Sequence, residues 1–193
     1  MRIGILGGTF DPPHMGHLIA AQDTFDALSL DKLLFIPARV PPHKQHETVS
    51  HADVRLRMVS AAIDGDERFE VSDVELQRTG PSYTIDTLRQ LKERFPADTL
   101  FLLVGVDQVR EFATWREPEE VLRCAQLVML TRAGIEEAPQ GDIVHTTVPV
   151  TRIDISSTLV RQRARAGLPI RYLVPEAVEK MIVTERLYTG SLG

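Results

Sequence analysis

One stretch near the N-terminus limits the folds open to this chain: an apolar run, a glycine-rich turn and a helical segment in direct succession. Ile3 to Leu6 predicts a buried strand, and Leu18 to Leu28 predicts a helix. The start of a helix after such a turn presents free backbone N–H groups, and the helix dipole favours negative charge there. The order of these segments therefore predicts an anion-binding site between them.

Two glycines and two histidines in this turn suit a phosphate ligand. Gly7 and Gly8 lack a Cβ atom, so a ligand can approach their backbone closely. His14 and His17 share one face if the helix begins just before them. A tight turn with two solvated histidines is the alternative interpretation. A structural zinc site is disfavoured because Cys124 is the only cysteine and no H-E-x-x-H pattern occurs.

Composition and charge exclude several classes of protein. With 193 residues, of which 43% are hydrophobic and 25% charged, the chain can form one domain with a sizeable core. No apolar run approaches the length of a membrane span, and the first strand begins too early for a signal peptide. A lone cysteine fits a reducing compartment, so we expect a cytoplasmic protein. A net charge of −5 argues against nucleic-acid binding and requires a local basic patch for anionic substrates.

Apolar runs alternate with helical segments along nearly the whole chain. Strands are expected over residues 32–36, 69–72, 99–105, 126–131 and 145–150. The run 99–105 is apolar throughout, which suits a parallel sheet covered on both faces. We therefore predict an α/β fold, Rossmann-like and doubly wound, with a mainly parallel sheet and helices on both faces. A single domain is expected over residues 1–193, with a short helical part from about residue 156.

Serines mark three predicted helix starts. Ser50 is expected to begin a helix with Asp53 in an approximate capping box, and Ser82 or Thr84 to cap the next. A serine caps a later helix, which Gly167 stops. Prolines predict a loop over residues 39–46, which is either a solvated surface loop or a basic flap over phosphates.

Two strings resemble the signatures of the nucleotidyltransferase superfamily. The first, G-G-T-F-D-P-P-H-M-G-H, ends at His17, and its H-x-G-H element binds the ATP phosphates in that superfamily. The second, I-S-S-T-L-V-R, ends at Arg161, which would bring a fixed charge with planar donors. Alone, the second string also fits an ordinary capped helix.

The middle of the chain narrows the resemblance. The strings P-H-K from Pro42, S-Y-T-I-D-T-L from Ser82, V-G-V-D from Val104 and F-A-T-W from Phe112 resemble the bacterial nicotinate mononucleotide adenylyltransferases. All stand in the family's order. The resemblance implies that ATP and nicotinate mononucleotide react, with Mg²⁺, to give deamido-NAD and pyrophosphate, a step of NAD synthesis. Arg116 departs from the pattern, since relatives often carry an aromatic residue there.

The resemblance also implies a set of site residues. Catalytic positions would be His14, His17, Lys44 and Arg161. Further ATP contacts would come from Gly8, Thr9, Phe10, Gly16, Gly105, Asp107, Ile155, Ser156 and Ser157. The mononucleotide would meet Lys44, Thr84, Trp115, Arg116 and Arg132. Asp107 would bind a ribose hydroxyl or position metal-bound water. Mg²⁺ would be held mainly by phosphates, with no protein metal site.

Alternative functions remain at this point. The chain could be another adenylyltransferase of the same fold, acting on nicotinamide mononucleotide or phosphopantetheine, or a non-catalytic ATP-sensing module. The expected partners are the small molecules ATP and nicotinate mononucleotide, with neither nucleic acid nor membrane, and homo-oligomerisation stays open. Backbone N–H groups at the helix start near Thr84 and at Arg116 are expected to favour the acid over the amide.

Overall fold

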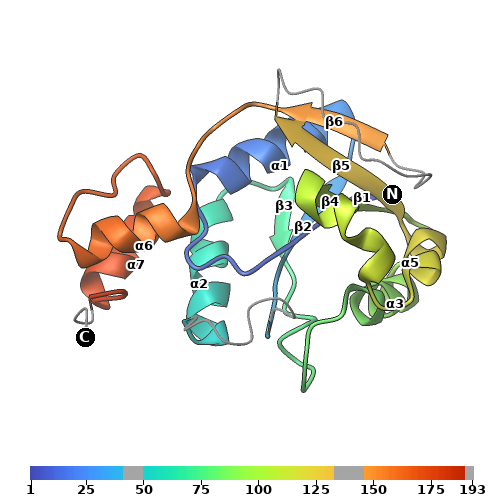
Figure 1. Ribbon diagram of the computed structural model, residues 1–193, viewed down its shortest axis with the longest axis horizontal. Helices are drawn as coiled ribbons and strands as arrows, with labels where there is room; N and C mark the ends of the chain where they lie inside the picture. The colour runs from blue at the N-terminus through green and yellow to red at the C-terminus, as the bar shows by residue number, and fades with distance from the viewer. Residues whose placement is uncertain (41–49, 133–145, 190–193) are drawn as a thin grey trace.

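A six-stranded parallel sheet forms the centre of the computed structural model, which describes residues 1–40, 50–132 and 146–189 (Figure 1). Its strand order is β3-β2-β1-β4-β5-β6, and every neighbouring pair is parallel. This is the doubly wound Rossmann order, with the switch point between β1 and β4. The predicted fold class is therefore confirmed. The strands are β1 (Arg2–Gly8), β2 (Lys32–Pro37), β3 (Phe69–Val71), β4 (Thr99–Gly105), β5 (Gln126–Arg132) and β6 (Thr146–Val150).

Helices cover both faces of the sheet. One buried cluster joins α1 and α2 to the sheet, and a second joins α3, α4 and α5 to the opposite face. Figure 1 shows α3 and α5 close together at one end of the molecule, with α1 on another side of the sheet. The described helices are α1 (Met15–Ala27), α2 (Ala52–Ile63), α3 (Thr84–Arg94), α4 (Val106–Arg110), α5 (Pro118–Cys124), α6 (Ser157–Arg165), α7 (Glu176–Thr184) and the 3-10 helix η2 (Phe112–Thr114).

Strand β2 illustrates why the central strands are apolar throughout. Leu33 and Phe35 point to the cluster under α1 and α2, whereas Leu34 and Ile36 point to the cluster under α3. All four side chains are buried. Successive side chains of a strand face opposite sides, so a strand covered twice needs apolar residues at every position.

The C-terminal helices build a third cluster, away from the sheet. Val160 of α6 and both Val178 and Ile182 of α7 pack against Met58 of α2. Figure 1 shows α6 and α7 beside α2 at one end of the molecule. Gly167 follows α6 with φ +66°, as expected of a glycine that ends a helix. Within the described ranges, no helix is both long and apolar enough to cross a lipid bilayer.

The predicted start of α2 at Ser50 is wrong. The helix begins at Ala52, with His51 as its N-cap. Ser50 is engaged elsewhere, because its N–H donates to Asp11 Oδ2 at 3.1 Å and its carbonyl accepts from Arg55 Nε at 2.9 Å. Tertiary contacts to the turn after β1 therefore take the place of a local cap.

The capping of α3 is also wrong, whereas that of α6 is confirmed. The N-cap of α3 is Tyr83, and no side chain caps this helix. The Ser82 hydroxyl instead accepts from the Arg39 N–H at 3.0 Å. At α6, the Ser156 side chain accepts from the Leu159 N–H at 3.1 Å, as the sequence predicts.

Candidate active site

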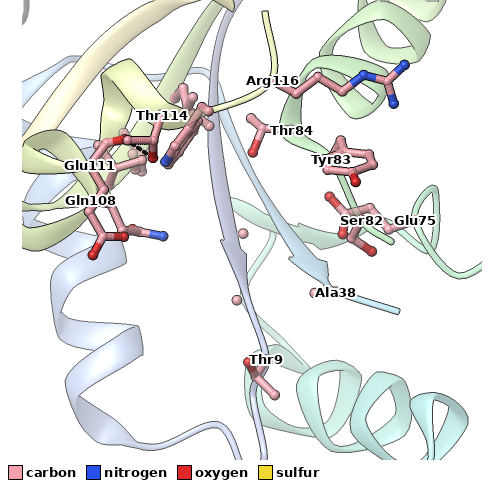
Figure 2. Close-up of a pocket in the computed structure, with 16 residues that line it drawn as sticks. Thr9, Ala38, Glu75, Ser82, Tyr83, Thr84, Gln108, Glu111, Thr114 and Arg116 are labelled. Atoms are coloured by element: carbon pink, nitrogen blue, oxygen red, sulfur yellow. Dashed lines mark hydrogen bonds between the residues drawn. The ribbon is translucent and has the colours of Figure 1, made fainter. Parts of the chain in front are cut away.

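A cavity of about 430 Å³ opens at the carboxyl ends of β1 and β4, next to the switch point of the sheet (Figure 2). Parallel strands end at the same edge, and open α/β sheets bind ligands there. Gly8 and Thr9 line the cavity from the end of β1, and Ala38 from the end of β2. The volume falls in the range of small-molecule sites. This places the glycine-rich turn at the mouth of a ligand-sized pocket.

Two elements form facing walls of this cavity. Figure 2 shows Ser82, Tyr83 and Thr84, at the start of α3, across from Gln108 and Glu111 of the segment around α4. The cavity is also lined by Thr114, the last residue of η2, and by Trp115 and Arg116 after it; Figure 2 shows Thr114 beside Glu111 and Arg116 on the side of Tyr83 and Thr84. The structure thus brings together three of the residues predicted for the mononucleotide, namely Thr84, Trp115 and Arg116.

The start of α3 offers uncapped donors to this cavity. Tyr83 provides no side-chain cap, and the first N–H groups of a helix lack an intrahelical partner, although that of Asp86 donates to the Tyr83 carbonyl at 3.1 Å. Arg116 lies beside this helix end, with its guanidinium 4.9 Å from the centre of the Tyr83 ring. Its Nη1 atom is 3.7 Å from Asp86 Oδ2. Backbone donors and an arginine therefore meet at one end of the pocket.

The two histidines of the first motif stack at the start of α1. Their ring centroids are 3.7 Å apart, and the rings of Phe10 and His17 meet in a T-shaped arrangement with centroids 5.0 Å apart. The His14 backbone N–H donates to His17 Nδ1 at 3.1 Å. In the neutral imidazole only one nitrogen carries a proton, so that of His17 sits on Nε2. His17 can therefore donate a hydrogen bond through Nε2.

Burial keeps both histidines neutral. It lowers the pKa of His14 from 6.5 to about 4. The pKa of His17 falls to about 3, first because of burial and then because of neighbouring His14. His14 Nδ1 is buried and has no hydrogen-bond partner within the described ranges. A buried polar atom without a partner is costly, which is consistent with a site shaped for a ligand.

Two glycines leave room for the rings of His14 and Phe10. A Cβ at Gly16 would lie 3.1 Å from Cε1 and Nδ1 of His14. At Gly8 it would lie 2.9 Å from Cζ of Phe10. The glycine between the two histidines is thus explained by packing, because a side chain there would push the first ring out of its stack.

The second motif lies against the first. The Ser157 hydroxyl donates to the Pro12 carbonyl at 2.8 Å, and Arg161 Nη1 donates to the Asp11 carbonyl at 2.8 Å. The Ile155 carbonyl lies 3.9 Å from the Cβ position of Gly16. The start of α6 and the start of α1 therefore converge. Ser156 is exposed and caps its own helix.

Several predicted residues lie apart from the cavity or outside the description. Gly105 and Asp107 stand at the end of β4 and in α4, and neither lines the cavity. The Asp107 side chain is 94% exposed, with Arg110 Nη1 at 3.5 Å. Lys44 lies outside the described residues, as does the side chain of Arg132. The predicted basic loop is described only as far as Val40.

Two buried charged residues were missed by the sequence analysis. Glu75 lines the cavity, and its Oε1 accepts from the Thr87 hydroxyl at 2.7 Å, while burial raises its pKa. Arg55 is 1% exposed and donates to the carbonyls of Thr9 and Ala38, at 2.8 and 2.7 Å. A charged residue on the apolar face of a predicted helix was the available signal for Arg55. Glu75 lies in a turn and had none.

Comparison with known protein sequences identifies the relatives of this chain. A profile of the cytidylyltransferase-like family matches residues 5–163. A probable nicotinate-nucleotide adenylyltransferase of Geobacillus kaustophilus is 42% identical over 192 residues, which cover 100% of this chain and 88% of the relative. A protein of the same description from Thermus thermophilus is 46% identical over 190 residues, covering 97% and 100%.

Solved structures share the fold. The nicotinic acid mononucleotide adenylyltransferase of Plasmodium falciparum, complexed with APC, has a TM-score of 0.77 and 18% identity, and covers 100% of this chain and 99% of its own. A putative nicotinate-nucleotide adenylyltransferase from Vibrio parahaemolyticus has a TM-score of 0.71 and 22% identity, covering 100% and 98%. At these identities the likeness establishes the fold.

Proposed function

This chain belongs to the nicotinate-nucleotide adenylyltransferases of the cytidylyltransferase-like family, and on that premise we propose that it transfers AMP from ATP to nicotinate mononucleotide. The products are deamido-NAD and pyrophosphate. The observation that supports this most directly is that the histidine turn, proposed to bind ATP, adjoins the cavity proposed to bind the mononucleotide. The turn that carries His14 and His17 is continuous with Gly8 and Thr9, which line the cavity proposed for the mononucleotide.

The reaction needs no nucleophile from the protein. A phosphate oxygen of the mononucleotide attacks the α-phosphorus of ATP, and the bond from that phosphorus to the bridging oxygen breaks. Pyrophosphate leaves with the electron pair. The protein's task is to align two polyanions and to offset their repulsion at the reacting centre.

The described residues have distinct parts in this task. His17 donates from Nε2 to a phosphate oxygen, and the start of α1 contributes its backbone N–H groups. Because both histidines are neutral, fixed positive charge must come from other groups. Arg161 at the adjoining start of α6 is one, and Lys44 is proposed as another from its place in the family pattern.

The mononucleotide is proposed to occupy the cavity. Trp115 would stack on its pyridine ring, and the N–H groups at the start of α3 would bind the carboxylate of the nicotinate. An amide in that position would turn its own NH₂ donors toward those N–H groups. This gives a physical reason for choosing the acid.

A magnesium ion fits this site as a companion of the nucleotide. Among the residues that the structure describes, no three or more His, Cys, Asp or Glu side chains are grouped to hold a metal. Mg²⁺ usually keeps several waters and binds through phosphates, so it can be held here without a cluster of protein ligands. When bound, it supplies charge neutralisation to the phosphates. Exposed Asp107 is the carboxylate proposed to hold one of its waters or a ribose hydroxyl.

Pyrophosphate release tests the proposed function. The purified protein is incubated with Mg²⁺ and ATP, with nicotinate mononucleotide, with nicotinamide mononucleotide, with phosphopantetheine, or with no acceptor. We expect release that depends on nicotinate mononucleotide, with an equal amount of deamido-NAD. ATP binding without release under any condition would instead support the ATP-sensing module. Faster release with phosphopantetheine would reassign the acceptor.

A further inference from the structure

The turn that precedes α1 is held by the distant C-terminal part of the chain. This turn, residues 11–14, leads from β1 to α1, and together with Met15, the first residue of α1, it has four hydrogen bonds to residues beyond position 156. Two of them come from α6, as described above. The Met15 N–H donates to the Leu173 carbonyl at 2.9 Å, and the Tyr188 hydroxyl donates to Asp11 Oδ1 at 2.7 Å.

The pair of Asp11 and Tyr188 is buried behind the turn. Asp11 is only 3% exposed. Its Oδ1 atom accepts from Tyr188 and its Oδ2 atom accepts from the Ser50 N–H. Both oxygens thus have partners within the protein. Burial and the Asp11 carboxylate raise the pKa of Tyr188, so its hydroxyl stays protonated and acts as the donor.

The backbone of Tyr188 is in a strained conformation. It lies in the turn after α7, with φ +65°, a left-handed conformation that L-residues other than glycine disfavour. Its ring packs against the cluster that joins α6 and α7 to α2. Strained backbone persists where surrounding contacts over-determine it. Here those contacts are the ring packing and the hydroxyl bond to Asp11.

We propose that Tyr188 is a positioning residue for the transfer reaction: its hydroxyl fixes Asp11, and Asp11 fixes the turn that presents the histidine pair to ATP. The inference rests on the proposed function. Tyr188 does not touch a substrate, since its hydroxyl is bonded to Asp11 on the buried side of the turn. His14 is the N-cap of α1 and follows Asp11 directly through two prolines, so a shift of the turn moves the reacting groups.

Removing one oxygen atom tests this. Tyr188→Phe keeps the ring packing and loses only the hydroxyl, with its bond to Asp11 Oδ1 and its weaker contact to Met58 Sδ at 3.9 Å. Tyr172→Phe is the matched control, because Tyr172 is 82% exposed. Misplacement by about 1 Å costs on the order of 10²-fold in rate, so we expect kcat of Tyr188→Phe to fall by about 10-fold or more. The KM for nicotinate mononucleotide should stay near the wild-type value, because the cavity is built by other elements.

The assay separates positioning from a loss of folding. All variants are assayed at a temperature where circular dichroism shows them fully folded. Asp11→Ala and the double variant complete a cycle: if the pair acts as a unit, the double variant is no slower than Asp11→Ala alone. Equal kcat for Tyr188→Phe and Tyr172→Phe would overturn the inference. So would a loss that appears only as lower thermal stability.

Failure of the proposed function gives a different pattern. If the wild-type protein makes no deamido-NAD, the transfer reaction is wrong, and calorimetric titration with ATP then tests the turn. A roughly 10-fold weaker ATP affinity in Tyr188→Phe than in Tyr172→Phe would still support its positioning by Tyr188. Equal affinities, or no binding by either variant, would overturn it.

Discussion

At the residue scale, burial leaves the two histidines neutral, so in the proposed reaction they would act through hydrogen bonds and not through charge. Burial lowers their pKa values to about 4 and about 3, so neither imidazole carries a positive charge at neutral pH, although each keeps one N–H. The backbone bond from His14 to Nδ1 of His17 sets which nitrogen of His17 donates. A donor fixed in this way needs no reorganisation as charge moves during transfer.

The first prediction concerns His17. If its Nε2–H stabilises charge that develops on the α-phosphate, His17→Ala should lower kcat by about 10²-fold or more and change ATP affinity little. Steady-state kinetics and ATP titration measure the two quantities. His51→Ala is the control, because the His51 side chain is 77% exposed and does not line the cavity. Wild-type kcat combined with weaker ATP binding would assign His17 to binding alone.

The second prediction is a pH dependence of stability. Both folded-state pKa values lie below 6.5, so as the pH falls below about 6.5 the unfolded chain binds protons that the folded chain does not. Stability should therefore decline from pH 6.5 toward pH 4, by up to about 1.4 kcal/mol per pH unit for each histidine. Urea unfolding at pH 7, 6 and 5 measures this slope.

A variant isolates the contribution of these histidines from that of the carboxylates. His14→Gln/His17→Gln should show a shallower decline than the wild type between pH 6.5 and pH 5, whereas His51→Gln should not. Parallel curves for all three proteins would show that the two histidines titrate normally.

At the element scale, the start of α3 is the part that we propose binds the carboxylate of nicotinate. Thr84 is its first residue, and Tyr83 before it has φ −79° and ψ 131°. Proline is tolerated at the first helical position, and it favours such an extended residue before it. A proline there removes one N–H and keeps the helix.

The third prediction uses this property. Thr84→Pro should lower kcat/KM for nicotinate mononucleotide by about 10-fold or more, since a hydrogen bond to a charged group contributes about 1.5–3 kcal/mol. The value for nicotinamide mononucleotide should fall less. Thr84→Ala keeps the N–H and should keep the ratio of the two values. Trp115→Ala should weaken both substrates without changing their ratio, because stacking does not detect the carboxylate. Equal losses in Thr84→Pro would refute selection by this helix end.

At the scale of the whole molecule, the site joins three parts of the fold. Arg55 ties the ends of β1 and β2 to the start of α2, and the C-terminal helices hold the turn before α1. A ligand that binds between these parts favours the folded state over the unfolded one.

The fourth prediction follows for magnesium. Mg²⁺ alone should leave the melting temperature unchanged, because we propose that it arrives with the phosphates. Mg²⁺ with ATP should raise it, by an amount that corresponds to about 2.7 kcal/mol when ATP is at 100 times its dissociation constant. Differential scanning calorimetry measures both, and a chelator should abolish transfer. A clear rise with Mg²⁺ alone would indicate a resident metal site.

The sequence by itself determined the doubly wound sheet and the place of the glycine–histidine turn between the first strand and the first helix. Burial on both faces leaves a continuous apolar run in each central strand, and the glycine–histidine spacing depends only on local chain geometry. Tertiary structure alone decided the rest. It moved the cap away from Ser50, left Asp107 exposed, and brought Tyr188 to Asp11 across nearly the full length of the chain. Such contacts arise from how whole helices pack, so no local pattern of residues encodes them.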